Sequence, residues 1–239
     1  AHFEDADLQG ADLSNATLLD GYFYGANLSK ANLTDADLAG TDLRRTNLRQ
    51  ANLRRANLQG ALMDSANLDG ASLVEADLES AYLDDASLAH ADLHEASLRG
   101  ADFRFTHLGG ANLQRANLEN ANMEGANLVK ARLDSATLTM TVLYKANLSA
   151  ANLHGASLHH AVLIGTQLAR ADLRKADLTE IYGPNAHLQQ AWLSEANLEL
   201  ANLVAADLSQ ADISHAVVVQ TNLQETNQRG ANLGASDLT

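Results

Sequence analysis

Leucine recurs at every fifth residue along the whole chain. The series runs from position 3 to position 238 in one register, and 39 of its 48 positions are Leu. Two residues before each of these lies a second apolar series, in which 38 of 48 positions are Ala. The residue between the two is Asp or Asn in 29 of 48 cases, so the repeating unit is A-(D/N)-L-x-x.

A period of five residues fits neither a regular helix nor a straight strand. Five residues advance about 500° around an α-helix, so a leucine stripe would slip around its surface. On a strand, side chains alternate between the two faces, and an odd period would send successive leucines to opposite faces. The chain must therefore turn once in every unit, with each Leu and its Ala pointing towards one axis. This pattern predicts a solenoid, in which Asp or Asn supplies a turn-forming side chain.

The aromatic residues indicate how many units close one coil. All nine Tyr and Phe residues lie in six units, which begin at positions 1, 21, 81, 101, 141 and 181. These starting positions differ by multiples of 20, as they would if four units formed one coil and the aromatic units shared one side. The sequence therefore predicts square coils of 20 residues, about twelve of them, in a rod about 58 Å long at the usual strand spacing.

The A-(D/N)-L-x-x unit resembles the motif of the pentapeptide-repeat family, and the resemblance covers essentially all 239 residues. It implies an all-β fold, a right-handed quadrilateral β-helix (a β-solenoid), with residues 1–239 as a single domain. In that family the Leu and the residue two before it point inward, which agrees with the periodicity. The resemblance says little about function, because the family hosts many roles.

Residues 178–185, LTEIYGPN, interrupt the repeat most sharply. The only Pro of the chain, Pro184, follows Gly183 at a Leu position, and Ile181 occupies an Ala position. Because the register continues on both sides, we expect a local bulge or kink at 181–185. Gln228, which also occupies a Leu position, predicts a frayed last coil.

The outward positions of the aromatic side carry many apolar residues, whereas those of the other three sides are mostly polar. A contiguous exposed apolar patch and aromatic anchors both favour an interface. We therefore expect this side to bind a protein partner or a second copy of the chain, most strongly over 142–184. The residues assigned to this surface are Tyr22, Tyr24, Leu62, Tyr82, Phe105, Val142, Tyr144, Val162, Ile164 and Tyr182.

Charge is unevenly distributed along the rod. The net charge of −14 argues against direct nucleic-acid binding, which needs basic residues to neutralise phosphates. Basic residues are nevertheless concentrated in 41–60, and 56–98 contain nine acidic residues and no Lys or Arg. This band indicates either mutual screening between adjacent coils or a salt-sensitive docking belt for an anion. The residues of this belt are Arg44, Arg45, Arg49, Arg54 and Arg55.

Catalytic, metal and cofactor chemistry is not predicted. The chain has no cysteine, hence no thiol nucleophile, and it has no run of 18 apolar residues that could span a membrane. His154 and the pair His159 and His160 are expected to point outward on adjacent sides, without converging on a metal ion and without matched carboxylates. A convex rod offers no pocket that excludes water, so we expect no enzyme activity.

The leading hypothesis is a non-catalytic scaffold that binds a protein or itself through the aromatic side. Two alternatives stay open. Quinolone-resistance members of the resembled family imitate duplex DNA and bind DNA gyrase, although this sequence shows neither the C-terminal helix nor the register-breaking loops of those relatives. The other alternative is a structural subunit that stacks head to tail into a filament. The sequence gives no indication of a cellular compartment.

Overall fold

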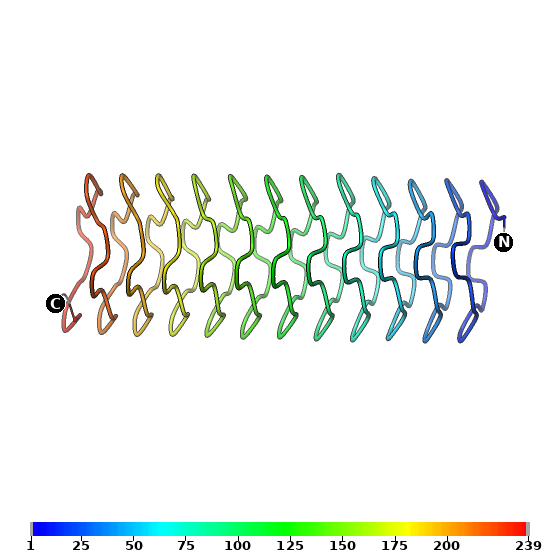
Figure 1. Cartoon of the computed structure of the whole chain (residues 1–239), viewed down its shortest axis with the longest axis horizontal. Coiled ribbons are helices and arrows are strands. Elements are labelled where there is room, and N and C mark those ends of the chain that lie inside the picture. The colour runs from blue at the N-terminus through cyan, green and yellow to red at the C-terminus, as the bar shows by residue number, and fades with distance from the viewer. Residues whose placement is uncertain (1, 238–239) are drawn as a thin grey trace.

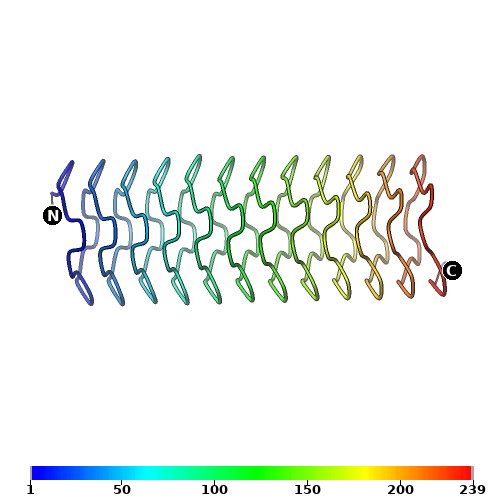
Figure 2. The same cartoon turned by 180° about the vertical axis from the view of Figure 1, so that it is seen from behind.

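Residues 2–237 are described by a computed structural model, in which the chain winds into a rod of stacked coils (Figure 1). The two ends of the chain lie at opposite ends of the rod, and the view from behind shows the same regular stacking (Figure 2). Leu238, the last position of the leucine series, lies outside the described residues. Between residues 2 and 237 there is neither an α-helix nor a strand longer than one residue. No part of this range therefore offers a helix long and apolar enough to cross a membrane.

Each residue at the Asp/Asn position pairs with the residue 20 places further on. These parallel bridges run in unbroken register from His2↔Tyr22 to Val217↔Asp237, which confirms the predicted coil of four units. We number the sides by the units of the first coil: side 1 begins at residue 1, side 2 at residue 6, side 3 at residue 11 and side 4 at residue 16. The pairing is one residue wide on each side, and the right-handed sense of the coil stays a prediction.

The five backbone N–H groups of a unit have fixed partners, as unit 26–30 illustrates. The N–H of Asn27 donates to the preceding coil, those of Leu28 and Lys30 donate to the next coil, and that of Ala26 closes a turn. The fifth N–H, that of Ser29, donates to Oδ1 of Asn27 at 3.2 Å. Asp and Asn recur at this position because their short side chains accept from the one N–H that the backbone leaves without a partner.

The last residue of every unit forms a corner with a left-handed backbone. From Asp5 to Ala235, all of these corner residues have a positive φ, and only 11 of them are Gly. The corner residue is third in a four-residue turn closed by a hydrogen bond to the leucine carbonyl, the place at which a type II turn needs a positive φ. A left-handed conformation costs a non-glycine residue roughly 1–2 kcal/mol. The stacking of each coil on its neighbours must offset this cost.

Leucine and alanine fill the axis of the rod, as the periodicity predicts. The inward Leu residues from Leu28 to Leu208 are almost fully buried. Five buried positions of the alanine series hold Thr instead, and their hydroxyl groups donate to carbonyl oxygens; Thr41 Oγ1, for example, lies 2.7 Å from the carbonyl oxygen of Leu38. Threonine is tolerated in this apolar core because its one polar group has a partner.

The bulge or kink predicted for 181–185 is wrong. Bridges Val162↔Tyr182 and Tyr182↔Asn202 continue the register through this unit, and Gly183 donates its N–H to Asn202 at 2.8 Å. Pro184 occupies the fourth position of the unit, where the N–H has no backbone acceptor in any coil and where a turn favours Pro. Tyr182 could not cap an N–H there as Asn does, so the missing donor of Pro184 leaves nothing unsatisfied.

Inside the same unit, two exchanges of size compensate each other. Ile181 is larger than the usual Ala and is buried, while Gly183 is smaller than the usual Leu. A Cβ atom added to Gly183 would lie 3.2 Å from Cδ2 of Leu203 and 3.5 Å from Cβ of Leu163. An apolar cavity of about 10 Å³, lined in part by these two leucines and Ile181, remains at this level. The unit therefore keeps its backbone path by redistributing side-chain volume.

The two end coils pack their inward residues less completely than the middle coils. Phe3 and Leu8 at one end, and Leu223 and Leu233 at the other, are only partly buried. Gln228 is exposed at its Leu position, and its Nε2 donates to Oγ1 of Thr226 at 2.8 Å. The last coil nevertheless keeps its bridges as far as Asp237, so its backbone register is intact while its core is loose.

Candidate functional site

Side 1 carries all ten residues that the sequence assigns to an interaction surface. Bridges between residues 20 apart place the side's outward residues in columns along the rod. Half of the ten are exposed and half are partly buried, so all of them can contribute contact area to a partner. The exposed members are Tyr22, Tyr24, Tyr82, Phe105 and Tyr182, and the partly buried members are Leu62, Val142, Tyr144, Val162 and Ile164.

The residues towards the C-terminal end of side 1 form one contiguous apolar surface. Val142, Val162 and Tyr182 are consecutive partners in the bridge column. The neighbouring column, two residues further along each unit, is apolar over four successive coils. Tyr182 stands out from this surface with 48% of its area exposed. We call this surface the apolar face; it consists of Val142, Tyr144, Val162, Ile164, Tyr182, Pro184 and Val204.

The aromatic residues nearer the N-terminus of side 1 are interleaved with charged ones. Arg44 and Arg45 place their guanidinium carbons 5.9 and 5.8 Å from the centre of the Tyr24 ring. The Phe105 ring lies against Gly125, since a Cβ atom added to that glycine would be 2.7 Å from two ring carbons. These rings therefore have partners within the chain, as Tyr144 of the apolar face has in Lys145, whereas the other residues of that face follow one another as a continuous apolar stretch.

Sequence reasoning missed several exposed apolar residues on the other sides. Trp192 on side 3 is 50% exposed and lies under the guanidinium of Arg174 at 5.9 Å. Side 4 was expected to be polar, but within residues 2–237 it exposes four large apolar side chains. The signal was present in the 20-residue register, since two of the four occupy corner positions of that side. These four residues are Leu19, Met140, Leu200 and Val217.

Four of the five arginines in the predicted anion-docking belt form ion pairs within the chain. Arg44 donates to Asp42 through Nη2 at 2.6 Å, and Arg55 donates to Asp35 at 2.6 Å. Arg54 contacts Glu75 at 2.5 Å, and Arg49 lies 3.6 Å from Asp69. The pairs of Arg49, Arg54 and Arg55 link adjacent coils, whereas the pair of Arg44 with Asp42 lies within one unit. Three of the five arginines thus follow the other interpretation of the band, mutual screening between coils, and the docking role stays a prediction.

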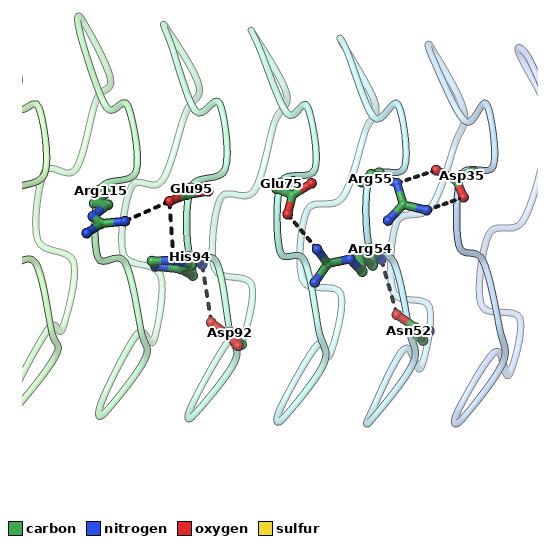
Figure 3. Close-up of polar contacts among 9 residues, drawn as sticks. All are labelled: Asp35, Asn52, Arg54, Arg55, Glu75, Asp92, His94, Glu95 and Arg115. Carbon is green, nitrogen blue, oxygen red and sulfur yellow. Dashed lines mark hydrogen bonds and ion pairs between the residues drawn. The ribbon is translucent and has the colours of Figure 1, made fainter.

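Two separate groups of ion pairs lie at and beside the corner between sides 3 and 4, one from Asp35 to Glu75 and one around Glu95 (Figure 3). Asp35, Arg55, Glu75, Glu95 and Arg115 are corner residues of successive coils. Glu95 accepts from Arg115 at 3.1 Å and lies 3.4 Å from Nε2 of His94. Such exposed pairs each contribute little stability, about 0–1 kcal/mol, but they fix the pattern of surface charge.

Ion pairing and burial shift the pKa values of the carboxyl groups in opposite directions. Hydrogen bonds from the Arg44 guanidinium lower the pKa of Asp42, and Arg174 lowers that of Asp172 in the same way. Burial raises the pKa of Asp84, whose Oδ1 is buried without a hydrogen-bond partner. In both of these pairs the carboxylate accepts from an arginine of its own unit, whereas the pKa of Asp35 is lowered by Arg55 of the next coil.

The concave parts of the surface are shallow and open. One hollow of about 280 Å³ is lined by Arg174, Trp192, Ser194 and Asp212 on side 3. Another of about 310 Å³ lies between Tyr24, the adjacent arginines and Asp64 on side 1. Neither brings together a nucleophile, a base and an oxyanion donor, so the apolar face is the strongest candidate for function.

The expectation for the histidine pair is wrong. His159 and His160 were expected not to converge and to lack a matched carboxylate. In the structure, Glu180 lies one coil further on, and ligand atoms of all three residues lie within 4.8 Å of one another. His160 has a φ of 58°, and this left-handed corner brings its ring to within 3.9 Å of the His159 ring, centre to centre. On an extended strand the two rings would point to opposite faces.

Comparison with known proteins gives a family match over most of the chain. The family described as pentapeptide repeats matches in eight copies, over residues 1–35, 31–70, 61–100, 101–139, 141–179 and 185–218. The gap between the last two ranges contains the irregular residues Ile181, Gly183 and Pro184. No curated protein sequence matches the chain.

Three solved structures illustrate the similarity. HetL, a pentapeptide repeat protein involved in heterocyst differentiation regulation from Nostoc sp. strain PCC 7120, is 29% identical over 92% of this chain and 86% of its own, with a TM-score of 0.42. Rfr23 from Cyanothece 51142 is 29% identical over 54% of this chain and 64% of its own, with a TM-score of 0.24. Full-length QnrB1, a plasmid-mediated fluoroquinolone resistance protein, is 14% identical over 93% and 91%, with a TM-score of 0.28.

Proposed function

The chain belongs to the pentapeptide-repeat family, and from that premise we propose that it is a non-catalytic scaffold that associates with proteins through the apolar face of side 1. The partner that we infer first is a second copy of the chain. A two-fold axis, the commonest symmetry of soluble dimers, brings the same surface of two copies together. The residues of the apolar face are uncharged, so two copies of it can meet without like-charge repulsion.

The contiguity of the apolar face carries this proposal. Val142, Val162 and Tyr182 follow one another in the bridge column, and no charged residue separates them. Elsewhere on side 1 the same column contains Asp42 and Asp102. Monomeric proteins seldom expose large continuous apolar patches, and those that occur usually mark an interaction site.

The polar surroundings of the face also support an interface. Lys145 lies at its border, where Nζ is 4.8 Å from the centre of the Tyr144 ring. Within the face, Pro184 has no N–H that would need a partner in a dry interface. An apolar centre with charge at its rim is the usual composition of a specific protein contact.

Sedimentation or light scattering over a range of protein concentrations tests the proposal. We expect the native chain to form dimers and the variant Tyr144→Ser, Ile164→Ser, Tyr182→Ser to stay monomeric, because all three side chains point outward and contribute apolar contact. The control variant Trp192→Ser removes an exposed aromatic residue from side 3 and is expected to dimerise as the native chain does.

Two results would contradict the proposal. One is a native chain that remains monomeric at concentrations of a hundred micromolar or more, on the order at which weak dimers form. The other is a triple variant that dimerises unchanged. Circular dichroism of each variant would show whether the coil is intact, since none of the substitutions touches the leucine axis.

A further inference from the structure

Three ligand-type side chains meet at the corner between sides 4 and 1. His159 and His160 are the last two residues of unit 156–160, and Glu180 is the corner residue of the same side in the next coil. Nδ1 of His160 lies 3.5 Å from Oε2 of Glu180. The side chain of His160 is 39% exposed and that of Glu180 is 43% exposed, so an ion in solution can reach them.

The backbone holds these residues in place from both directions along the rod. Met140 donates its N–H to the carbonyl oxygen of His159 at 2.9 Å, and His160 donates to Thr179 at 3.1 Å. Glu180 donates to Glu199 at 2.9 Å. The Cα positions are therefore fixed by the stacking of coils, and only side-chain rotation is needed to bring the three ligand atoms onto one ion.

We propose that His159, His160 and Glu180 form a surface site for a divalent transition-metal ion of the zinc class. Two imidazole nitrogens and one carboxylate oxygen are a ligand set that Zn²⁺ uses in proteins, with water in the fourth position. In a tetrahedral zinc site, ligand atoms are about 3.3 Å apart. The contact between His160 and Glu180 is already close to that spacing, and the full set needs a modest contraction from 4.8 Å.

The set differs chemically from the two other close histidine–carboxylate contacts among residues 2–237, that of His2 with Glu4 at 3.0 Å and that of His94 with Glu95. In each of these a single histidine meets the carboxylate. His94 and Glu95 are 3.4 Å apart, but Glu95 also accepts from the Arg115 guanidinium at 3.1 Å (Figure 3). That carboxylate is already neutralised, and only one histidine is present. Within residues 2–237, by contrast, His160 is the basic residue that pairs with Glu180, and a second imidazole lies beside it. A divalent ion would replace a weak contact there instead of a guanidinium pair.

Titration of the untagged, metal-free chain with Zn²⁺ in a calorimeter tests the site. We expect one zinc ion per chain, with the affinity reduced at least tenfold in His159→Ala and in Glu180→Gln. The variant His94→Ala is the matched control, and its affinity is expected to equal that of the native chain. Substitution with Co²⁺ gives a second readout, because a tetrahedral site with nitrogen and oxygen ligands produces visible absorption bands that an octahedral aqua ion shows only weakly.

The proposal is overturned if the native chain binds no Zn²⁺ at millimolar concentration, or if His159→Ala and Glu180→Gln bind as tightly as the native chain. An equal loss of affinity in His94→Ala would also overturn it, since the ion would then bind elsewhere. All four residues are on the outer surface, so their substitution leaves the leucine axis unchanged, and circular dichroism would verify this.

Discussion

At the scale of single residues, the composition of the repeat is explained by the need to give every backbone N–H a partner more than by hydrophobicity. Leu and Ala define the inside, but the Asp or Asn between them satisfies the one N–H per unit that the coils do not. In unit 171–175, Asp172 has two tasks. Its Oδ1 accepts from the Arg174 N–H at 3.1 Å, and its two oxygens accept from the Arg174 guanidinium at 2.8 and 2.6 Å. The cap and the ion pair can therefore be separated by substitution.

We predict that Asp172→Ala destabilises the rod by about 1–2 kcal/mol, because the Arg174 N–H loses its acceptor. Asp172→Asn keeps an acceptor oxygen and loses only the ion pair of an exposed arginine, so it should cost less than about 1 kcal/mol. Urea unfolding at pH 7 measures the free energy of unfolding of both variants and of the native chain. A larger loss in the Asn variant than in the Ala variant would contradict the capping role.

The contribution of the Asp172–Arg174 pair to stability depends on pH, and the direction of the Asp172 pKa shift determines how. The pKa of Asp172 is lowered in the folded chain by hydrogen bonds from Arg174. The stabilisation is therefore complete above the ordinary pKa of 3.8 and is lost as the pH falls through the lower folded value. The native chain and Asp172→Asn should therefore have the same free energy of unfolding when urea unfolding is measured at a pH well below the folded pKa of Asp172.

At the scale of the five-residue unit, the position of a Pro or Gly decides whether it interrupts the coil. The sequence suggested a kink at 181–185 because Pro and Gly usually interrupt regular structure. The prediction was wrong because each unit contains one position that donates to no backbone group, and Pro184 occupies it. The small Gly183 was likewise compensated by a large Ile181 across the same unit. A pattern of five residues shows which positions face inward, but it does not show which N–H groups are spare.

We predict that Ile181 and Gly183 are coupled through the volume they share. Ile181→Ala alone should destabilise the rod by about 2–4 kcal/mol by enlarging the cavity, and Gly183→Leu alone should destabilise it by about 1–3 kcal/mol by overpacking. The double variant restores the usual Ala and Leu and should be at least as stable as the native chain. Thermal unfolding of all four proteins measures the coupling, and additive losses would contradict shared packing.

At the scale of the whole molecule, the register determines which distant residues become neighbours. The 20-residue coil and the gathering of the aromatic residues on side 1 could be predicted because the Tyr and Phe positions share one period. Which carboxylate each arginine of 41–60 pairs with could not be predicted, because the direction of the side chains decides those pairs. The carboxylates concerned are Asp42, Asp35, Glu75 and Asp69. The convergence of His159, His160 and Glu180 was missed because it depends on the left-handed corner. The apolar face thus rests on periodicity, and the proposed metal site rests on backbone conformation.

Cross-linking between coils tests the register most directly. The chain has no cysteine, so a pair of introduced thiols is unambiguous. The first double variant, Val142→Cys with Val162→Cys, places the thiols on bridged residues of adjacent coils. The second, Val142→Cys with Ser157→Cys, places them on different sides of the rod. With a dibromomaleimide reagent, which joins only neighbouring thiols, the account predicts a rapid intramolecular cross-link in the first pair and little or none in the second. Equal cross-linking of both pairs, or preference for the second, would contradict the 20-residue coil and with it the apolar face.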